Sequence, residues 1–112
     1  MPRSPAARAL MTSAPVFAAL GDELRLRLVA RLCEEGPLSI ARLTEGSNVT
    51  RQAVTRHLHV LADAGLVHGA RDGRENLWTL EPRRLEQARR HLDLISKQWD
   101  DALDRLKAFV EG

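Results

Sequence analysis

The chain has 112 residues, the length of a single domain, and its 17 basic and 15 acidic side chains leave a formal net charge of only +2. Hydrophobic residues make up 44%, too many for a disordered chain. No apolar run approaches the roughly 18 residues of a membrane-spanning helix, and we expect no secretory signal because the first residues lack its apolar region. The single cysteine, Cys33, cannot form a disulfide within the chain. It favours a reducing, cytoplasmic location and excludes a zinc site made of cysteines alone.

Residues 1–13 precede the first predicted helix. They contain two prolines, two serines and no acid, so we expect a flexible N-terminal tail. A short helix is then predicted from about Pro15, which suits the first position of a helix, to Leu20. Gly21 ends it.

Two further helices are predicted before the middle of the chain. The first starts after Asp22, a good N-cap, and ends at Gly36. Cys33 lies beside its apolar stripe, where a free cysteine is commonly buried. The next helix is short, with Ser39 as its N-cap and Gly46 after its end. The apolar stripe of the longer helix has helical spacing and consists of Leu24, Leu28, Val29 and Leu32.

The stretch from Asn48 to Gly65 predicts a helix with one buried and one polar face. Thr50 is a natural N-cap, and His57 lies beside the buried face, where we expect a packed, hydrogen-bonded histidine. Arg51 lies on the other flank. The buried face recurs at helical spacing through Val54, Leu58 and Leu61. At about 100° per residue, the opposite face carries Gln52, Thr55, Arg56, His59 and Asp63.

Two segments with alternating polarity follow, from Leu66 to Arg71 and from Arg74 to Leu80. The Asp72-Gly73 pair between them predicts a hairpin, because a type I′ turn needs positive φ at both central positions. We expect Trp78, on the second strand, to pack beneath this hairpin. The alternative for Trp78 and for Trp99 of the last predicted helix is a small-molecule pocket near the dimer interface.

A long helix is predicted from about Pro82 to Val110, roughly 40 Å at ~1.5 Å per residue. Its apolar residues alternate spacings of three and four, as in the seam of a coiled coil. One small domain cannot bury so long a stripe, so we expect a partner helix, most simply from a second copy. The seam comprises Leu85, Ala88, Leu92, Ile95, Trp99, Ala102 or Leu103, Leu106 and Phe109.

This order of elements predicts a mainly α fold with a small β-hairpin wing. Residues 14–81 form a winged helix-turn-helix DNA-binding domain, and residues 82–112 form a long C-terminal dimerisation helix. The second helix of such a motif enters the major groove in known DNA readers. Glutamine pairs with adenine and arginine with guanine, so the polar face of the 50–64 helix has base-reading chemistry. Arg71 and Arg74 flank the hairpin tip, where they suit phosphates or the minor groove.

Three motifs resemble those of a known family. The run LGDELRLRLV, from Leu20 to Val29, is similar to the opening of ArsR-type winged helix-turn-helix repressors. The run VTRQAVTRHL, from Val49 to Leu58, resembles their recognition helix, and AGLV at residues 64–67 resembles the segment that follows. The resemblance covers about residues 15–110.

This resemblance implies a homodimer that binds a pseudo-palindromic operator and represses transcription until a signal lowers its DNA affinity. It implies dimerisation through the first and last helices, with Val16, Phe17 and the seam from Leu85 to Phe109. It implies base contacts from Gln52, Thr55 and Arg56, backbone proximity for Thr50 and Arg51, and wing contacts from Arg71 and Arg74. We add His59, which shares the polar face.

The chain departs from the family where its metal sensors bind metal. Some members carry a cysteine pair in the third helix, whereas residues 38–42 here contain neither thiol nor imidazole. Others carry Asp-x-His and His-x-x-Glu on the last helix, and of these two motifs this sequence has only His91 and Asp93. We therefore expect no metal, no cofactor and an effector that the sequence does not identify.

Two other functions stay open. Winged helices also serve as protein-interaction or dimerisation modules, and salt-dependent DNA binding distinguishes the two functions. The other alternative is a metal- or redox-responsive regulator with an atypical site, which bound metal or a Cys33-dependent response to oxidation would favour. No catalytic set is present, so we do not expect an enzyme. The expected partners are double-stranded DNA and a second copy, with no membrane.

Overall fold

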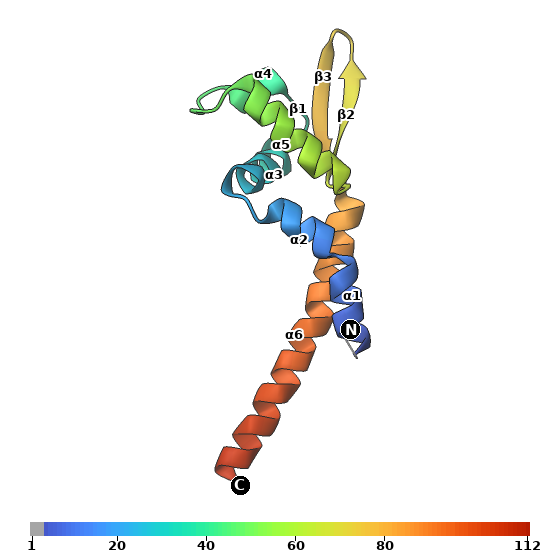
Figure 1. Cartoon of the computed structure of the whole chain (residues 1–112), viewed down its shortest axis with the longest axis vertical. Helices are drawn as coiled ribbons and strands as arrows, with labels where there is room; N and C mark the ends of the chain where they lie inside the picture. Colours follow the sequence, from blue (N-terminus) through green and yellow to red (C-terminus); the bar gives the residue numbers. More distant parts are fainter. Residues whose placement is uncertain (1–3) are drawn as a thin grey trace.

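The computed structural model describes residues 4–112 as a helical head with a β-hairpin, mounted on a long C-terminal helix (Figure 1). Its extents are 66 × 25 × 23 Å. None of the helices within these residues combines the length and apolar character that crossing a membrane requires. In chain order, the elements are α1 (Pro5–Thr12), α2 (Ala14–Leu20), α3 (Glu23–Glu35), β1 (Leu38–Ser39), α4 (Ile40–Thr44), α5 (Arg51–Asp63), β2 (Val67–Asp72), β3 (Glu75–Leu80) and α6 (Pro82–Glu111).

The prediction of a flexible tail over residues 1–13 is wrong, because Pro5–Thr12 form the helix α1. Residues 1–3 lie outside the described residues. Ser4 caps α1, since its Oγ accepts a hydrogen bond from the Ala7 N–H at 3.0 Å, and Pro5 occupies the first helical position. Ala6 is buried, and α1 packs alongside α6 (Figure 1). The serine and prolines that suggested a loop are also a standard helix start.

The next helices begin where the sequence predicts. Asp22, Ser39 and Thr50 each accept a hydrogen bond from the backbone N–H three residues further on, at 3.0–3.2 Å. Each bond satisfies one of the N–H groups that the first turn of α3, α4 or α5 leaves free. The caps therefore fix where the two helices of the helix-turn-helix start.

The end of α5 is a Schellman motif that turns the chain into β2. The Leu66 N–H donates to the Leu61 carbonyl and the Gly65 N–H to the Ala62 carbonyl, both at 2.9 Å. Gly65 has φ +78°, and a Cβ there would lie 3.0 Å from Cγ of Arg84. Both the backbone conformation and the contact with α6 thus favour glycine.

The hairpin is present, but its predicted turn is wrong by one residue. Asp72 pairs with Glu75, so the two-residue loop is Gly73-Arg74. Gly73 has φ +61°, and no described residue other than glycine has positive φ. Positive φ at the first central position alone is the pattern of a type II′ turn, which also matches the twist of the strands.

A third strand that the sequence analysis missed completes the sheet, in the order β1-β3-β2. In β1, Leu38 pairs with Trp78 and Ser39 with Leu77. A strand of two residues is too short to show alternating polarity, so only the helix cap at Ser39 was visible in the sequence.

The core lies where α2, α3, α4, α5, the sheet and the first turns of α6 meet. The predicted buried face of α5 is confirmed, because Val54, Leu58 and Leu61 are all 0% exposed. Cys33 is exposed, contrary to expectation. At about 100° per residue, Cys33 lies 40° further around α3 than Val29. This position is beyond the edge of the buried face of α3.

Candidate nucleic-acid interface

The polar face of α5 points away from the core. Arg51, Gln52, Arg56 and His59 are exposed, while Thr55 is half-buried and its Oγ donates to the Arg51 carbonyl at 2.8 Å. The buried stripe on the other side of α5 anchors this orientation. The structure therefore places all the predicted α5 contact residues on its accessible surface.

Two exposed arginines of α5, Arg56 on this face and Arg51 on its flank, are free to meet an anion. Within residues 4–112, neither Arg51 nor Arg56 forms an ion pair, and no carboxylate lies within 4.0 Å of either guanidinium. By contrast, Arg31 of α3 pairs with Glu35 at 2.9 Å. Arginine presents a planar fork of donors that fits both phosphates and guanine edges.

The wing adds two further exposed arginines next to α5. Arg74 lies in the turn at the hairpin tip, and Arg71 pairs with Asn76 across the strands. Nε of Arg71 donates to the Gly73 carbonyl at 3.3 Å, which leaves its Nη groups available. The hairpin projects from the head beside α5 (Figure 1).

An aromatic contact joins α5 to the wing. The rings of His59 and Trp78 lie 5.9 Å apart between centroids, with 49° between their planes. Trp78 is half-buried beneath the hairpin, as predicted. The sequence predicts a DNA contact for His59 but not its contact with Trp78, because Trp78 lies 19 residues further along the chain.

His57 is the packed, hydrogen-bonded histidine that the sequence predicts. Its Nδ1 lies 3.3 Å from Nη1 of Arg25 and 4.0 Å from Oδ1 of Asp22. Arg25 also donates through Nε to the Ala19 carbonyl at 2.6 Å, so this cluster ties α2 and α3 to α5. The Arg25 backbone N–H, and then the positive charges of Arg25 and His57, hold the pKa of Asp22 below its ordinary value.

Histidine and carboxylate side chains are not grouped for metal binding in the described part of the chain, where no cluster of three or more potential ligands occurs. His91, on α6, instead meets the buried Ser13 between α1 and α2, with Nδ1 and Oγ 2.6 Å apart. The sequence analysis missed this contact, because it treated Ser13 as part of a loose tail.

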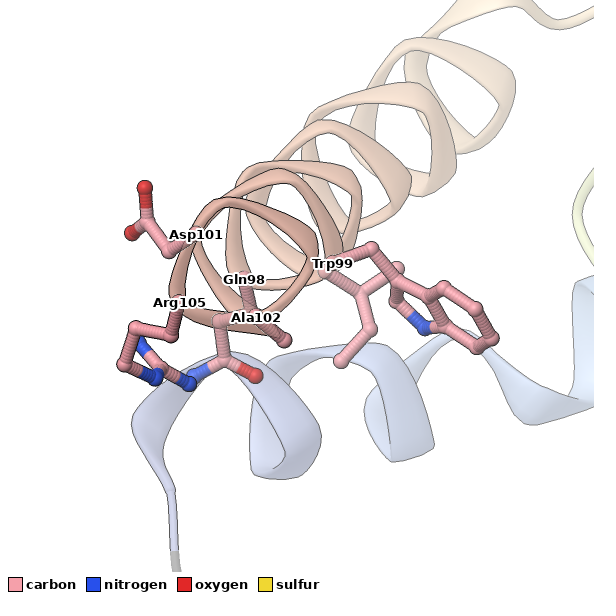
Figure 2. A pocket seen from close by; sticks show the side chains of 6 residues that line it. Gln98, Trp99, Asp101, Ala102 and Arg105 are labelled. Carbon is pink, nitrogen blue, oxygen red and sulfur yellow. The ribbon is translucent and has the colours of Figure 1, made fainter. Parts of the chain in front are cut away.

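The apolar seam of α6 is largely uncovered within the protomer. Leu92 is 46% exposed, Trp99 66% and Phe109 85%, and Leu103 and Leu106 are also exposed. Figure 2 shows Trp99 standing out from the side of α6 opposite Asp101. Phe17, Leu85 and Ile95 are half-buried, while Val16 is 2% exposed and belongs to the protomer core.

Comparisons with known proteins agree with this geometry. A family model described as a helix-turn-helix domain matches residues 20–70, which contain α3, α4 and α5. The arsenic resistance transcriptional regulator ArsR1 of Pseudomonas putida is 31% identical over 105 residues, which cover 94% of this chain and 71% of that protein. The chain belongs to the ArsR family of transcriptional regulators.

Further ArsR-family relatives match most of the chain. The HTH-type transcriptional repressor SmtB of Mycobacterium tuberculosis is 30% identical over 102 residues, covering 91% of this chain and 73% of that protein. The solved structure of an ArsR-like transcriptional regulator from Rhodococcus sp. RHA1 has a TM-score of 0.75 and 34% identity, covering 87% of this chain and 91% of that one. The predicted family and winged helix-turn-helix fold are confirmed.

Proposed function

We propose that this ArsR-family regulator is a homodimeric repressor that inserts α5 into the major groove and sets its wing on the flanking backbone. The observation that carries the proposal is the exposed face of α5, where Arg51 and Arg56 have no ion pair in the described structure. Gln52 and Arg56 supply base-reading donors, and Thr50, Arg51, Arg71 and Arg74 supply phosphate contacts. Thr55 and His59 complete the face.

The small net charge of the chain is compatible with DNA binding. Residues 81–112 contain seven basic and seven acidic side chains, so α6 with its preceding residue is neutral. Local fields rather than the total charge steer a protein onto DNA. The positive groups that matter are therefore those of α5 and the wing.

The proposed dimer forms through the exposed seam of α6. An apolar stripe this long is stable in water when another apolar surface covers it. A second copy offers the same stripe, and a two-fold dimer pairs each patch with itself. The interface residues are Phe17, Leu85, Leu92, Ile95, Trp99, Leu103, Leu106 and Phe109. Two α5 helices held by one dimer match a pseudo-palindromic operator.

The test is fluorescence-anisotropy binding to labelled DNA from upstream of the protein's own gene, against scrambled DNA, at two salt concentrations. We expect tighter binding to the native sequence and a steep loss of affinity with salt, because bound arginines release counterions. Absence of binding even at low salt contradicts the proposal and favours a protein-interaction module.

Arg56→Ala sharpens the test, with Arg90→Ala as its control. Both substitutions remove one exposed arginine, but Arg90 lies on α6 outside the proposed interface. We expect Arg56→Ala to weaken specific binding by ~1–3 kcal/mol and to relax the preference at one base position. Equal effects of the two substitutions would remove Arg56 from the base contacts.

A further inference from the structure

A groove lies between α5 and the wing, and Trp78 is one of the residues that line it. Thr55 and His59 line it from α5, while Gly69, Arg71 and Asn76 line it from the hairpin. Its volume is about 530 Å³, within the ~300–1,000 Å³ range of small-molecule sites. The groove is therefore large enough for a compact ligand.

The glycine of the groove lies against an aromatic ring. Gly69 pairs with Trp78 across the hairpin, and a Cβ at Gly69 would lie 3.7 Å from the six-membered ring of the indole. The absence of that side chain leaves the ring next to bare backbone. Trp78 is only half-buried and lines the groove. A flat ligand can lie along its indole, since aromatic rings attract one another in offset stacks.

The groove also holds hydrogen-bond donors that the protein does not use. Within residues 4–112, the only buried side-chain nitrogen or oxygen without a partner is Nε1 of Trp78. The amide of Asn76 and the Nη groups of Arg71 also have no hydrogen-bond partner among the described residues.

The charge of the groove has one sign. Arg71 contributes a guanidinium, and none of the described residues that line the groove is acidic. Guanidinium groups bind carboxylates and phosphates through two parallel hydrogen bonds. An apolar ring face beside unpaired donors and a positive charge matches a ligand that is flat at one end and anionic at the other.

We propose that this groove binds a small aromatic carboxylate, with its ring along Trp78 and its carboxylate facing Arg71 and Asn76, and that the bound anion displaces DNA. The displacement rests on the proposed function, because Thr55, His59 and Arg71 serve both the groove and the DNA interface. Two ligands that need the same groups exclude each other, so each lowers the affinity of the other. Binding of such a small molecule would thus directly release the protein from its operator.

Benzoate is the probe, and the fluorescence of Trp78 reports its binding in the full chain without DNA. Trp99→Phe leaves Trp78 as the sole tryptophan. We expect a saturable change in Trp78 emission with benzoate and none with benzyl alcohol, which has the ring without the charge. Sodium chloride at matched ionic strength controls for salt.

Two wing variants provide the matched comparison. Arg71→Gln and Arg74→Gln each remove one positive charge, but only Arg71 lines the groove. We expect Arg71→Gln to weaken benzoate binding about tenfold or more, and Arg74→Gln less than about twofold. A linear response to benzoate, or equal losses in both variants, overturns the proposal.

The effect on DNA is measured separately. Benzoate should weaken operator binding by the parent chain, and Asn76→Ala, which lies outside the proposed DNA contacts, should bind DNA normally but lose the response. If Trp78 responds to DNA and not to benzoate, the groove belongs to the DNA interface and the anion site is refuted. If benzoate binds but no DNA does, the anion site stands and the proposed function fails.

Discussion

Replacing Trp99 with alanine removes the largest exposed apolar side chain of α6 and tests the proposed dimer. Trp99 is 66% exposed in the protomer, and a tryptophan side chain offers about 200 Å² of surface. If the dimer covers half of the exposed part, each copy contributes about 1.6 kcal/mol at ~25 cal/mol per Å². A symmetric dimer contains two copies, so the loss is about 3 kcal/mol, or a ~200-fold weaker dimer.

Sedimentation velocity over a range of protein concentrations measures this dissociation constant. Lys97→Ala is the control, since Lys97 is also exposed on α6 and lies about 200° around the helix from Trp99. We expect Lys97→Ala to leave the dimer intact and Trp99→Glu to give monomers or unfolded protein, because a charge would lie in an apolar interface. Equal dissociation constants for Trp99→Ala and Lys97→Ala would refute the seam as the interface.

Three further predictions concern the protomer. Leu58→Ala should lower the free energy of unfolding in urea by ~2–5 kcal/mol, because Leu58 is 0% exposed. Val60→Ala on the same helix is the control and should lower the free energy of unfolding by less than ~1 kcal/mol. Similar losses for the two variants would contradict the packing of α5. The lowered pKa of Asp22 contributes stability at pH above 3.8, and this contribution disappears as the pH falls through the lower pKa of the folded state. Asp22→Asn, which keeps the cap acceptor but does not titrate, should therefore lose less stability on acidification, and an unchanged acid denaturation profile would argue against the effect. Exposed Cys33 should react with a thiol reagent in the folded protein as fast as in urea, and protection until unfolding would show that it is buried.

Much of the fold could be predicted because its signals are local. The caps at Asp22, Ser39 and Thr50 each depend on a side chain and a backbone N–H three residues away, and the buried stripe of α5 depends on helical spacing alone. The sequence also predicts the hairpin, but it places the turn at Asp72-Gly73, one residue before the turn in the structure. Asp-Gly favours a type I′ turn by its own propensity, and the strand register that selected Gly73-Arg74 depends on pairing across the sheet.

Several of the features that escaped prediction are contacts between distant segments. Ser13 meets His91 across 78 residues, and this contact accompanies the packing of α1 against α6 that a loose tail would not make. Trp78 pairs with Leu38 across the sheet and meets His59 of α5, and both Trp78 and His59 line the groove. The polar face of α5 was predictable as a surface, but its neighbours were not, because the positions of β1 and β3 follow from tertiary packing.

Because α6 is long, a small rotation at the seam of the proposed dimer would move each head over a larger distance. Trp99 lies 17 residues beyond Pro82, where α6 joins the head, a separation of about 26 Å at ~1.5 Å per residue. A change of about 10° in the angle between the two seams would therefore carry each head, and its α5, through roughly 4–5 Å. That distance exceeds the ~3.4 Å between successive bases along one strand of DNA. In the proposed dimer, a minor repacking around Trp99 would thus shift each α5 by about one base-pair step relative to its DNA.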